Sequence, residues 1–349
     1  MTATPRSDWL RAARAVRRGL ADVAAGPAYV SECDPGVVLS AVPARRLDAV
    51  APRIAMFLGN ARDASWRRKP RVVALHGVWT CGSVALSCDG SVLFMVGADF
   101  HHALHVFDVV SGGVLDVVGP RTGGRGCREF AAPCAIAMAP DGVLCIAERG
   151  NARVQLLTPG LEFASFVGAG ALGAPCSVAA TSAVVVVAQL GRHLLSVFSR
   201  DGGALIAAVP TAPELAPPSR LCFLDTRRVC VATIESSEMY IIDLAGKGGG
   251  EEGPSFGPPF RVYASMALGV AHVGGSCVAA AHLDALLVYR LSGLDTVTYA
   301  EATKIAPPKG GKFLSVASSA DTLAVACDAR GHAVECHLFN TNALMDEFR

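Results

Sequence analysis

The chain has 349 residues, of which 52% are hydrophobic and 6% aromatic, and its 31 basic and 30 acidic side chains give a formal net charge of +1. This composition is typical of a soluble globular protein that buries a large core. The charge is divided unevenly. Residues 1–70 hold 12 Lys and Arg against 6 acidic residues, whereas residues 71–349 hold 19 against 24. The longer segment therefore lacks the basic excess of nonspecific nucleic-acid binders, although these totals still allow a basic patch on one face.

The basic N-terminal extension, residues 1–70, predicts an amphipathic helix near its start. Apolar residues recur there at spacings of 4, 3, 4 and 3, and arginines fill much of the remaining surface. The apolar positions are Trp9, Ala13, Val16, Leu20 and Val23. This helix can dock on the rest of the chain or on a partner, or it can be a mitochondrial targeting segment, which Asp8 and Asp22 weaken. No secretory signal is visible, so we expect a cytoplasmic protein, with mitochondria as the alternative.

After residue 70 one pattern recurs every 41 to 52 residues: a strand, a tight turn, an apolar second strand, a polar stop and a third strand. Six residues mark the starts of the second strands, namely Gly90, Gly142, Ala183, Arg228, Ser276 and Thr322. Repeats of this length built from short strands are typical of β-propeller blades. The sequence therefore predicts an all-β, six-bladed β-propeller over residues 71–340, with a mostly helical N-terminal extension and a C-terminal tail at residues 341–349.

The strands of each blade can be read in order. The second strands are so apolar that we expect both faces to be covered; they are 91–96, 143–147, 184–188, 229–233, 277–281 and 323–327. The third strands are expected at 103–107, 152–156, 194–198, 239–242, 285–289 and 334–339. The pairs Asp89-Gly90 and Asp141-Gly142 favour tight hairpins between the first two strands of their blades.

The last blade has no fourth strand after residue 339, and residues 71–77 precede the first blade without a blade of their own. We expect residues 71–77 to supply the missing strand, because a ring closed in this way leaves no open sheet edge.

The second blade carries a family resemblance. Residues 133–157 have a proline at the entry to the first strand, then Asp-Gly, an apolar strand, an acidic stop at Glu148 and Gly-Asn-x-Arg. This segment resembles an NHL repeat, and Pro175 and Pro218 recur at the matching place in the next two blades. The resemblance implies a six-bladed ring. It does not choose among protein-binding, RNA-binding and enzymatic members of such folds.

Twelve cysteines are scattered without any Cys-x-x-Cys pair, which excludes zinc fingers and thioredoxin-like centres and favours small core residues in a reducing compartment. His101, His102 and His105 can be considered as metal ligands, but no carboxylate follows at a matching spacing, so we interpret them as loop and strand-start residues. Hydrolase, nucleotide-binding and zinc-protease motifs were not found. We therefore predict no catalytic residue, metal or cofactor.

Residues 163–191 contain no charged side chain, which is a feature of membrane spans. The stretch also holds several glycines, Pro175 and Gln189, and the repeat divides it into strands and turns. A continuous spanning helix would need an unbroken apolar core, so we expect strands and no membrane span.

A polar residue stands where each second strand ends, so that six blades place six polar side chains around one face. These residues are Asp99, Glu148, Gln189, Glu235, His282 and Asp328. They can cap their own turns or form a binding rim. The leading prediction is a noncatalytic NHL-like propeller, a scaffold that presents this loop-rich face to an unknown protein partner. The candidate contacts are Arg149, Asn151, Arg192, His193, Glu235 and His282.

The alternative is a propeller enzyme, a metal-assisted hydrolase or lyase with its site at the channel mouth, which would need several His or carboxylate groups converging there. Binding of RNA is a weaker option, because it needs a basic face with exposed aromatic side chains.

Overall fold

The computed structural model describes residues 70–75, 78, 80–97, 102–211, 216–233, 238–244, 255–256, 260–261, 267–291, 299–328 and 334–346. The extension predicted for residues 1–70 lies outside this set except for Pro70. Asp99, His101 and Glu235 also lie outside it.

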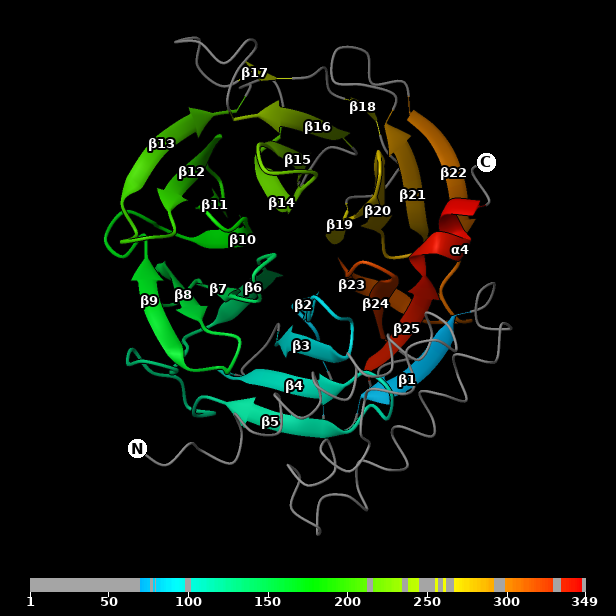
Figure 1. Cartoon of the computed structure of the whole chain (residues 1–349), viewed down its shortest axis with the longest axis horizontal. Coiled ribbons are helices and arrows are strands. Elements are labelled where there is room, and N and C mark those ends of the chain that lie inside the picture. Colours follow the sequence, from blue (N-terminus) through cyan, green and yellow to red (C-terminus); the bar gives the residue numbers. More distant parts are fainter. Residues whose placement is uncertain are drawn as a thin grey trace, which may run out of the picture. The chain divides into compact units, whose positions relative to one another are not determined.

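Six antiparallel sheets stand around a common centre, which confirms the six blades (Figure 1). The first strands lie innermost: β2 (Ser83–Leu86), β6 (Pro133–Met138), β10 (Pro175–Ala180), β14 (Pro218–Phe223), β19 (Gly269–Gly274) and β23 (Lys312–Ser318). The second strands are β3 (Val92–Val96), β7 (Leu144–Glu148), β11 (Val184–Gln189), β15 (Arg228–Thr233), β20 (Cys277–Ala281) and β24 (Thr322–Asp328). The third strands are β4 (Leu104–Asp108), β8 (Arg153–Leu157), β12 (Leu194–Ser199), β16 (Glu238–Asp243), β21 (Leu286–Leu291) and β25 (Val334–Asn340).

The outer strands vary more. Five blades have a single one: β5 (Val114–Val118), β9 (Phe163–Val167), β13 (Leu205–Pro210), β22 (Tyr299–Ile305) and, in the sixth blade, β1 (Arg71–Leu75). In the fourth blade two short strands, β17 (Ser255–Phe256) and β18 (Phe260–Arg261), both pair with β16. The charge-free stretch 163–191 consists of β9, β10 and β11 with their turns. No helix in the described part of the chain is long and apolar enough to span a membrane.

Local sequence explains the hairpins inside the blades. Gly90 and Gly142 adopt φ values of 68° and 84°, a region that glycine enters without a steric penalty. The amide of each closes a turn, Gly90 N donating to Ser87 O at 2.7 Å and Gly142 N to Ala139 O at 2.9 Å. The two Asp-Gly turns are therefore confirmed.

The blades pack on one another through apolar side chains. The second strands are buried almost throughout, as their composition predicted. Six apolar clusters each combine side chains of two neighbouring blades, so that one cluster fills every interface around the ring. A ring sealed in this way places the loops of all six blades on two opposite faces.

The first and last segments of the ring meet in the sixth blade. Strand β1 (Arg71–Leu75) pairs antiparallel with β25, with Arg71 opposite Leu338 and Leu75 opposite Val334. The two strands lie side by side in Figure 1, in blue and red. The predicted closure is confirmed. The chain then continues into a six-residue helix, α4 (Thr341–Asp346), within the segment expected to be a tail.

Candidate binding face and central channel

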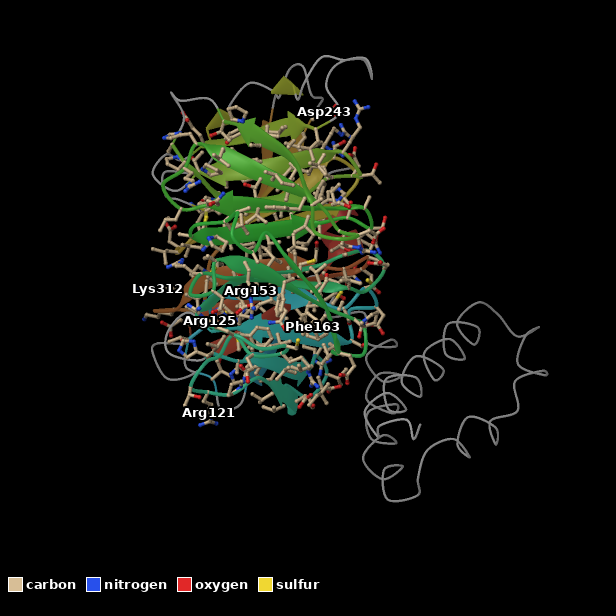
Figure 2. All side chains as sticks on the ribbon, turned by 90° about the vertical axis from the view of Figure 1, so that its left-hand side faces the viewer. Arg121, Arg125, Arg153, Phe163, Asp243 and Lys312 are labelled. Carbon is tan, nitrogen blue, oxygen red and sulfur yellow. The ribbon has the colours of Figure 1, made fainter. Side chains whose placement is uncertain are left out.

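The ring has two faces with different loops. We call the upper face the one formed by the turns after the second strands and by the connections into the first strands; its described loops include 119–132, 149–152, 168–174, 190–193, 282–285 and 306–311. The lower face carries the hairpins between first and second strands and the turns between third and fourth strands. Figure 2 shows the ring from the side, with Arg125 and Lys312 toward one face and Asp243 toward the other.

Glu148 ends β7 and is completely buried. Its carboxylate accepts hydrogen bonds from Arg153 Nε at 2.8 Å, from the amide of Ala131 at 3.1 Å, from Asn151 Nδ2 at 2.5 Å and from Gln155 Nε2 at 3.2 Å. A buried carboxylate with this many donors is satisfied within the protein. Glu148 therefore acts as a structural anchor, and its oxygens are not available to a ligand.

The cation of this pair is held equally well. The guanidinium of Arg153 donates to the carbonyl oxygens of Arg125 at 2.8 Å, Gly126 at 3.3 Å and Glu129 at 3.4 Å, and it lies 3.8 Å from the centre of the Phe166 ring. These bonds fasten the connection 119–132 to the second blade. The connection therefore has a defined shape on the upper face.

The equivalent polar residues of the next two blades also bond locally. Gln189 Oε1 accepts from the amide of Gly173 at 2.7 Å, and Gln189 Nε2 donates to Ser196 Oγ at 3.0 Å. In the fourth blade the second strand ends at Thr233, two residues before the predicted Glu235, and Thr233 Oγ1 donates to the carbonyl of Glu238 at 3.0 Å. The polar residues at the ends of the second strands were expected either to cap their own turns or to form a binding rim, and these local hydrogen bonds favour turn capping.

The predicted contact residues fall into three groups. Arg149, Arg192 and His193 are exposed on the upper face. Asn151 is half-buried, and its amide nitrogen donates to Gly124 O at 2.8 Å as well as to Glu148, so it supports the loop. His282 is completely buried and offers no surface to a partner.

Sequence reasoning missed two further arginines of the upper face. Arg121 and Arg125 are exposed in the connection 119–132 (Figure 2). The sequence feature that could have identified them is the high density of charged residues in the glycine-rich segment 121–129, which does not match any strand of the repeat. Together with Arg149 and Arg192, they make four exposed arginines on the described part of the upper face.

The arginines of the two faces differ in their partners. On the lower face, Arg200 pairs with Asp141, Arg227 with Asp243 and Arg228 with Asp225, each at 2.5 Å. On the upper face no carboxylate pairs with the described arginines 121, 125, 149 and 192. The two faces therefore present different electrostatic surfaces, with unneutralised positive charge on the upper one.

Two of the histidines considered as metal ligands are placed. His102 Nδ1 accepts from the amide of Ala132 at 2.9 Å, and His105 is buried in β4 beside Phe107, with ring centres 6.2 Å apart. The described residues contain no group of three or more His, Cys, Asp or Glu able to hold a metal. All eleven described cysteines are free, and most are buried.

The central channel is lined by the six innermost strands. Its described lining is mostly small or apolar side chains and includes one arginine, Arg220, from β14. A cavity of about 40 Å³ lies among these residues.

Together the six sheets, their closed circle and the two loop faces define the class of protein, a six-bladed β-propeller. No protein-family model and no curated protein matches the chain. The solved structure of U3-55K is similar, with a TM-score of 0.53 and 13% identity over 77% of this chain and 98% of that one. The crystal structure of the RRP9 WD40 repeats is similar with a TM-score of 0.55 and 12% identity over 78% of this chain and 97% of that one.

These similarities support the propeller fold. The second of these structures is of WD40 repeats, so the solved neighbours do not support the NHL family in particular. At 12 to 13% identity the likeness concerns the fold alone.

Proposed function

We propose that this propeller is a noncatalytic scaffold that binds the acidic surface of a protein partner through its upper face. The observation that carries the proposal is a contrast between the faces: three lower-face arginines are paired with aspartates, whereas Arg121, Arg125, Arg149 and Arg192 are exposed on the upper face without such partners. Arginine is enriched at binding hot spots, because it combines several donors with a flat packing surface.

The construction of the upper face supports the same proposal. Its longest described connection is fixed by the buried pair of Glu148 and Arg153, so a partner meets a shape that is already ordered. Preorganised loops lose less conformational entropy on binding than mobile ones. Unpaired positive charge also accelerates encounter with an acidic partner.

The finer assignment to an NHL-like repeat is part of the proposal. It is supported by the second blade, where the acidic stop Glu148 accepts hydrogen bonds from the Asn151 and Arg153 side chains and stands opposite Pro133 at the start of β6. The enzymatic alternative gains no such support. The thirteen described residues that line the cavity in the channel include no histidine and no carboxylate.

The proposal is tested by two double variants of equal charge change. The full chain and its variants are used to capture partners from cells of its source, with and without ribonuclease, and the captured protein is then purified. Replacing Arg149 and Arg192 by Ala should weaken its binding by on the order of 1–3 kcal/mol. Replacing the lower-face Arg227 and Arg228 by Ala should leave the affinity within experimental error.

Equal affinities of the two double variants would place the interaction elsewhere. Capture that disappears after ribonuclease would show RNA, rather than an acidic protein, to be what the face binds.

A further inference from the structure

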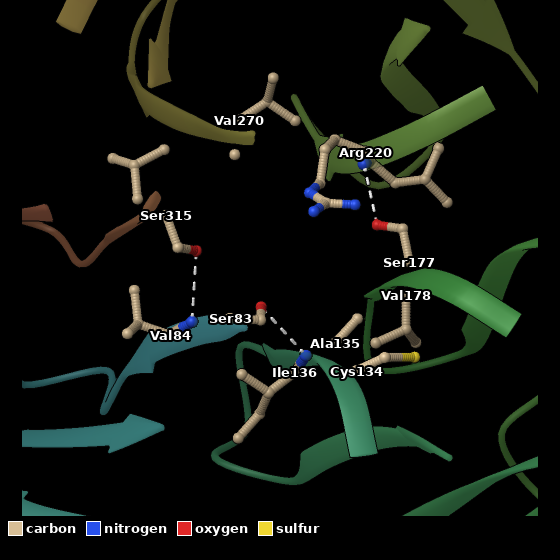
Figure 3. Close-up of a pocket in the computed structure, with 13 residues that line it drawn as sticks. Ser83, Val84, Cys134, Ala135, Ile136, Ser177, Val178, Arg220, Val270 and Ser315 are labelled. Carbon is tan, nitrogen blue, oxygen red and sulfur yellow. Dashed lines mark hydrogen bonds between the residues drawn. The ribbon is translucent and has the colours of Figure 1, made fainter. Parts of the chain in front are cut away.

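One level of the central channel is lined by a single residue from each innermost strand. These six residues are Ser83, Ala135, Ser177, Arg220, Gly269 and Ser315. Five of them are small, and the sixth is an arginine. Figure 3 shows the guanidinium of Arg220 reaching into the space between the strands.

Arg220 is held in that position by backbone oxygens. Its Nε donates to Leu268 O at 2.5 Å, and its Nη1 donates to Ser219 O at 2.8 Å. Its Nη2 makes no hydrogen bond with the described residues, and no carboxylate pairs with the guanidinium there. The channel therefore holds a fixed cation with one edge free.

Three serine hydroxyls surround the same space. Ser83 Oγ accepts from Ile136 N at 3.3 Å, Ser177 Oγ accepts from Leu221 N at 3.1 Å, and Ser315 Oγ accepts from Val84 N at 3.3 Å. Figure 3 marks all three bonds. Because each oxygen is used as an acceptor toward the next blade, its own O–H remains to donate into the channel.

The surroundings of Arg220 disfavour its positive charge, because the side chain is partly removed from water and a second arginine lies nearby. Burial lowers the pKa of the Arg220 guanidinium below its ordinary value, and the positive charge of Arg149 acts in the same direction. The positive charge of Arg149 also acts on the thiol of Cys134, which lines the channel. A half-buried cation without a counter-ion is partly deprived of water, and a bound anion relieves that cost.

We infer that the central channel binds a small oxyanion, a phosphate or carboxylate group, on Arg220 and the serine hydroxyls. The cavity of about 40 Å³ corresponds to roughly three water molecules, which suits one such group. The free Nη2 and the hydroxyls offer donors, and the described lining offers no acidic side chain to compete. The site lies in the channel and not among the upper-face loops, and the charge of Arg149 acts on both.

The test uses the purified full chain in a buffer without oxyanions. Titration calorimetry and the thermal midpoint are followed while inorganic phosphate or acetate is added at constant ionic strength. The wild-type protein should bind at least one of them saturably, with a Kd of about 1 mM or tighter, and its midpoint should rise. Phosphate binding alone would indicate a phosphate ligand, whereas acetate binding indicates that a carboxylate is also accepted.

Two variants locate the site. Arg220→Met keeps the length of the side chain without its charge and should weaken binding at least tenfold, while its midpoint without anion is equal to or above that of the wild type. Arg227→Met, which removes an exposed arginine from the lower face, should bind as the wild type does.

Absence of saturable binding to the wild-type protein would overturn the inference whatever the variants do. Equal binding by wild type and Arg220→Met would overturn it as well. If Arg220→Met does not fold, Arg220→Lys, which keeps the charge but not the fork of donors, should bind several-fold more weakly. Unchanged binding by that variant would also contradict the assignment. No partner protein is used, so these outcomes leave the proposed docking face to its own test.

Discussion

Single residues of this ring act mainly through what they bond inside it. Glu148 is the clearest example: it stands at the position from which the repeat suggested a binding group, yet four donors from its own blade and the preceding connection occupy its carboxylate. Its role is to join Arg153 and the connection 119–132 to the second blade.

Replacing Glu148 by Ala should lower the free energy of unfolding by about 3–5 kcal/mol, because a buried cation is left without its carboxylate. Glu162→Ala is the control, since Glu162 forms an exposed pair with Arg128 at 3.4 Å and its loss should cost about 1 kcal/mol or less. Urea denaturation monitored by fluorescence measures both. Similar values for the two variants would show that the buried network does not contribute as described.

Asp141 gives a dependence on pH. The hydrogen bond from Arg200 lowers the pKa of this carboxyl below its ordinary 3.8. The ionised form is therefore the stabilising one: its contribution is present above about pH 4 and is lost as the pH falls through the lowered pKa. Asp141→Asn should reduce stability by about 1 kcal/mol or less at pH 7, because the Asp141 carboxylate is exposed to solvent. The difference from wild type should shrink in acid, and a difference that does not change with pH would contradict the ion pair.

Residue roles were less predictable from the sequence than residue positions. The exposed Arg149 and Arg192 followed from the repeat, but the burial of His282 depends on how its turn packs. The sequence distinguishes Arg220 from its counterparts only when the blades are aligned with one another. Two residues after the proline that begins the strand, two other blades have Ala135 and Ser177, and the fourth has arginine.

At the scale of elements, strand β1 has a role that its place in the chain does not suggest. It completes the sixth blade beside β25, and its Val73 and Leu75 join the apolar cluster between the sixth and first blades. The alternation of buried and exposed residues along β1 shows which side faces that cluster.

This alternation gives a matched pair of variants. Val73→Lys with Leu75→Lys should lower the thermal midpoint strongly, since burial of each side chain contributes about 1.5–3 kcal/mol and a buried charge adds a further cost. Val72→Lys with Ala74→Lys changes the two exposed positions of the same strand and should have little effect. Calorimetry compares them, and equal midpoints would show that the ring does not depend on this closure.

Strand positions could be predicted closely because apolar second strands and Asp-Gly turns are local signals. The sequence indicated strands at 184–188 and 194–198, and the structure has β11 and β12 there. The divided outer edge of the fourth blade could not be predicted. Its short strands β17 and β18 are defined by pairing with β16 and carry little pattern of their own.

At the scale of the whole molecule, the ring separates two kinds of surface. The acidic excess of residues 71–349, 24 acidic against 19 basic side chains, hides an upper face with four unpaired arginines and a lower face where three arginines pair with aspartates. The overall charge of residues 71–349 correctly argued against a uniformly basic ring, but it could not show this local asymmetry. Only the closed ring assigns each loop to a face.

The most direct test of the proposed docking face is hydrogen–deuterium exchange of the full chain with and without its purified partner. Our account predicts slower exchange on binding in the upper-face segments 119–132, 149–152 and 190–193. It predicts no change in the lower-face turns 181–183, 200–204 and 224–227. Protection confined to the lower-face turns would contradict it.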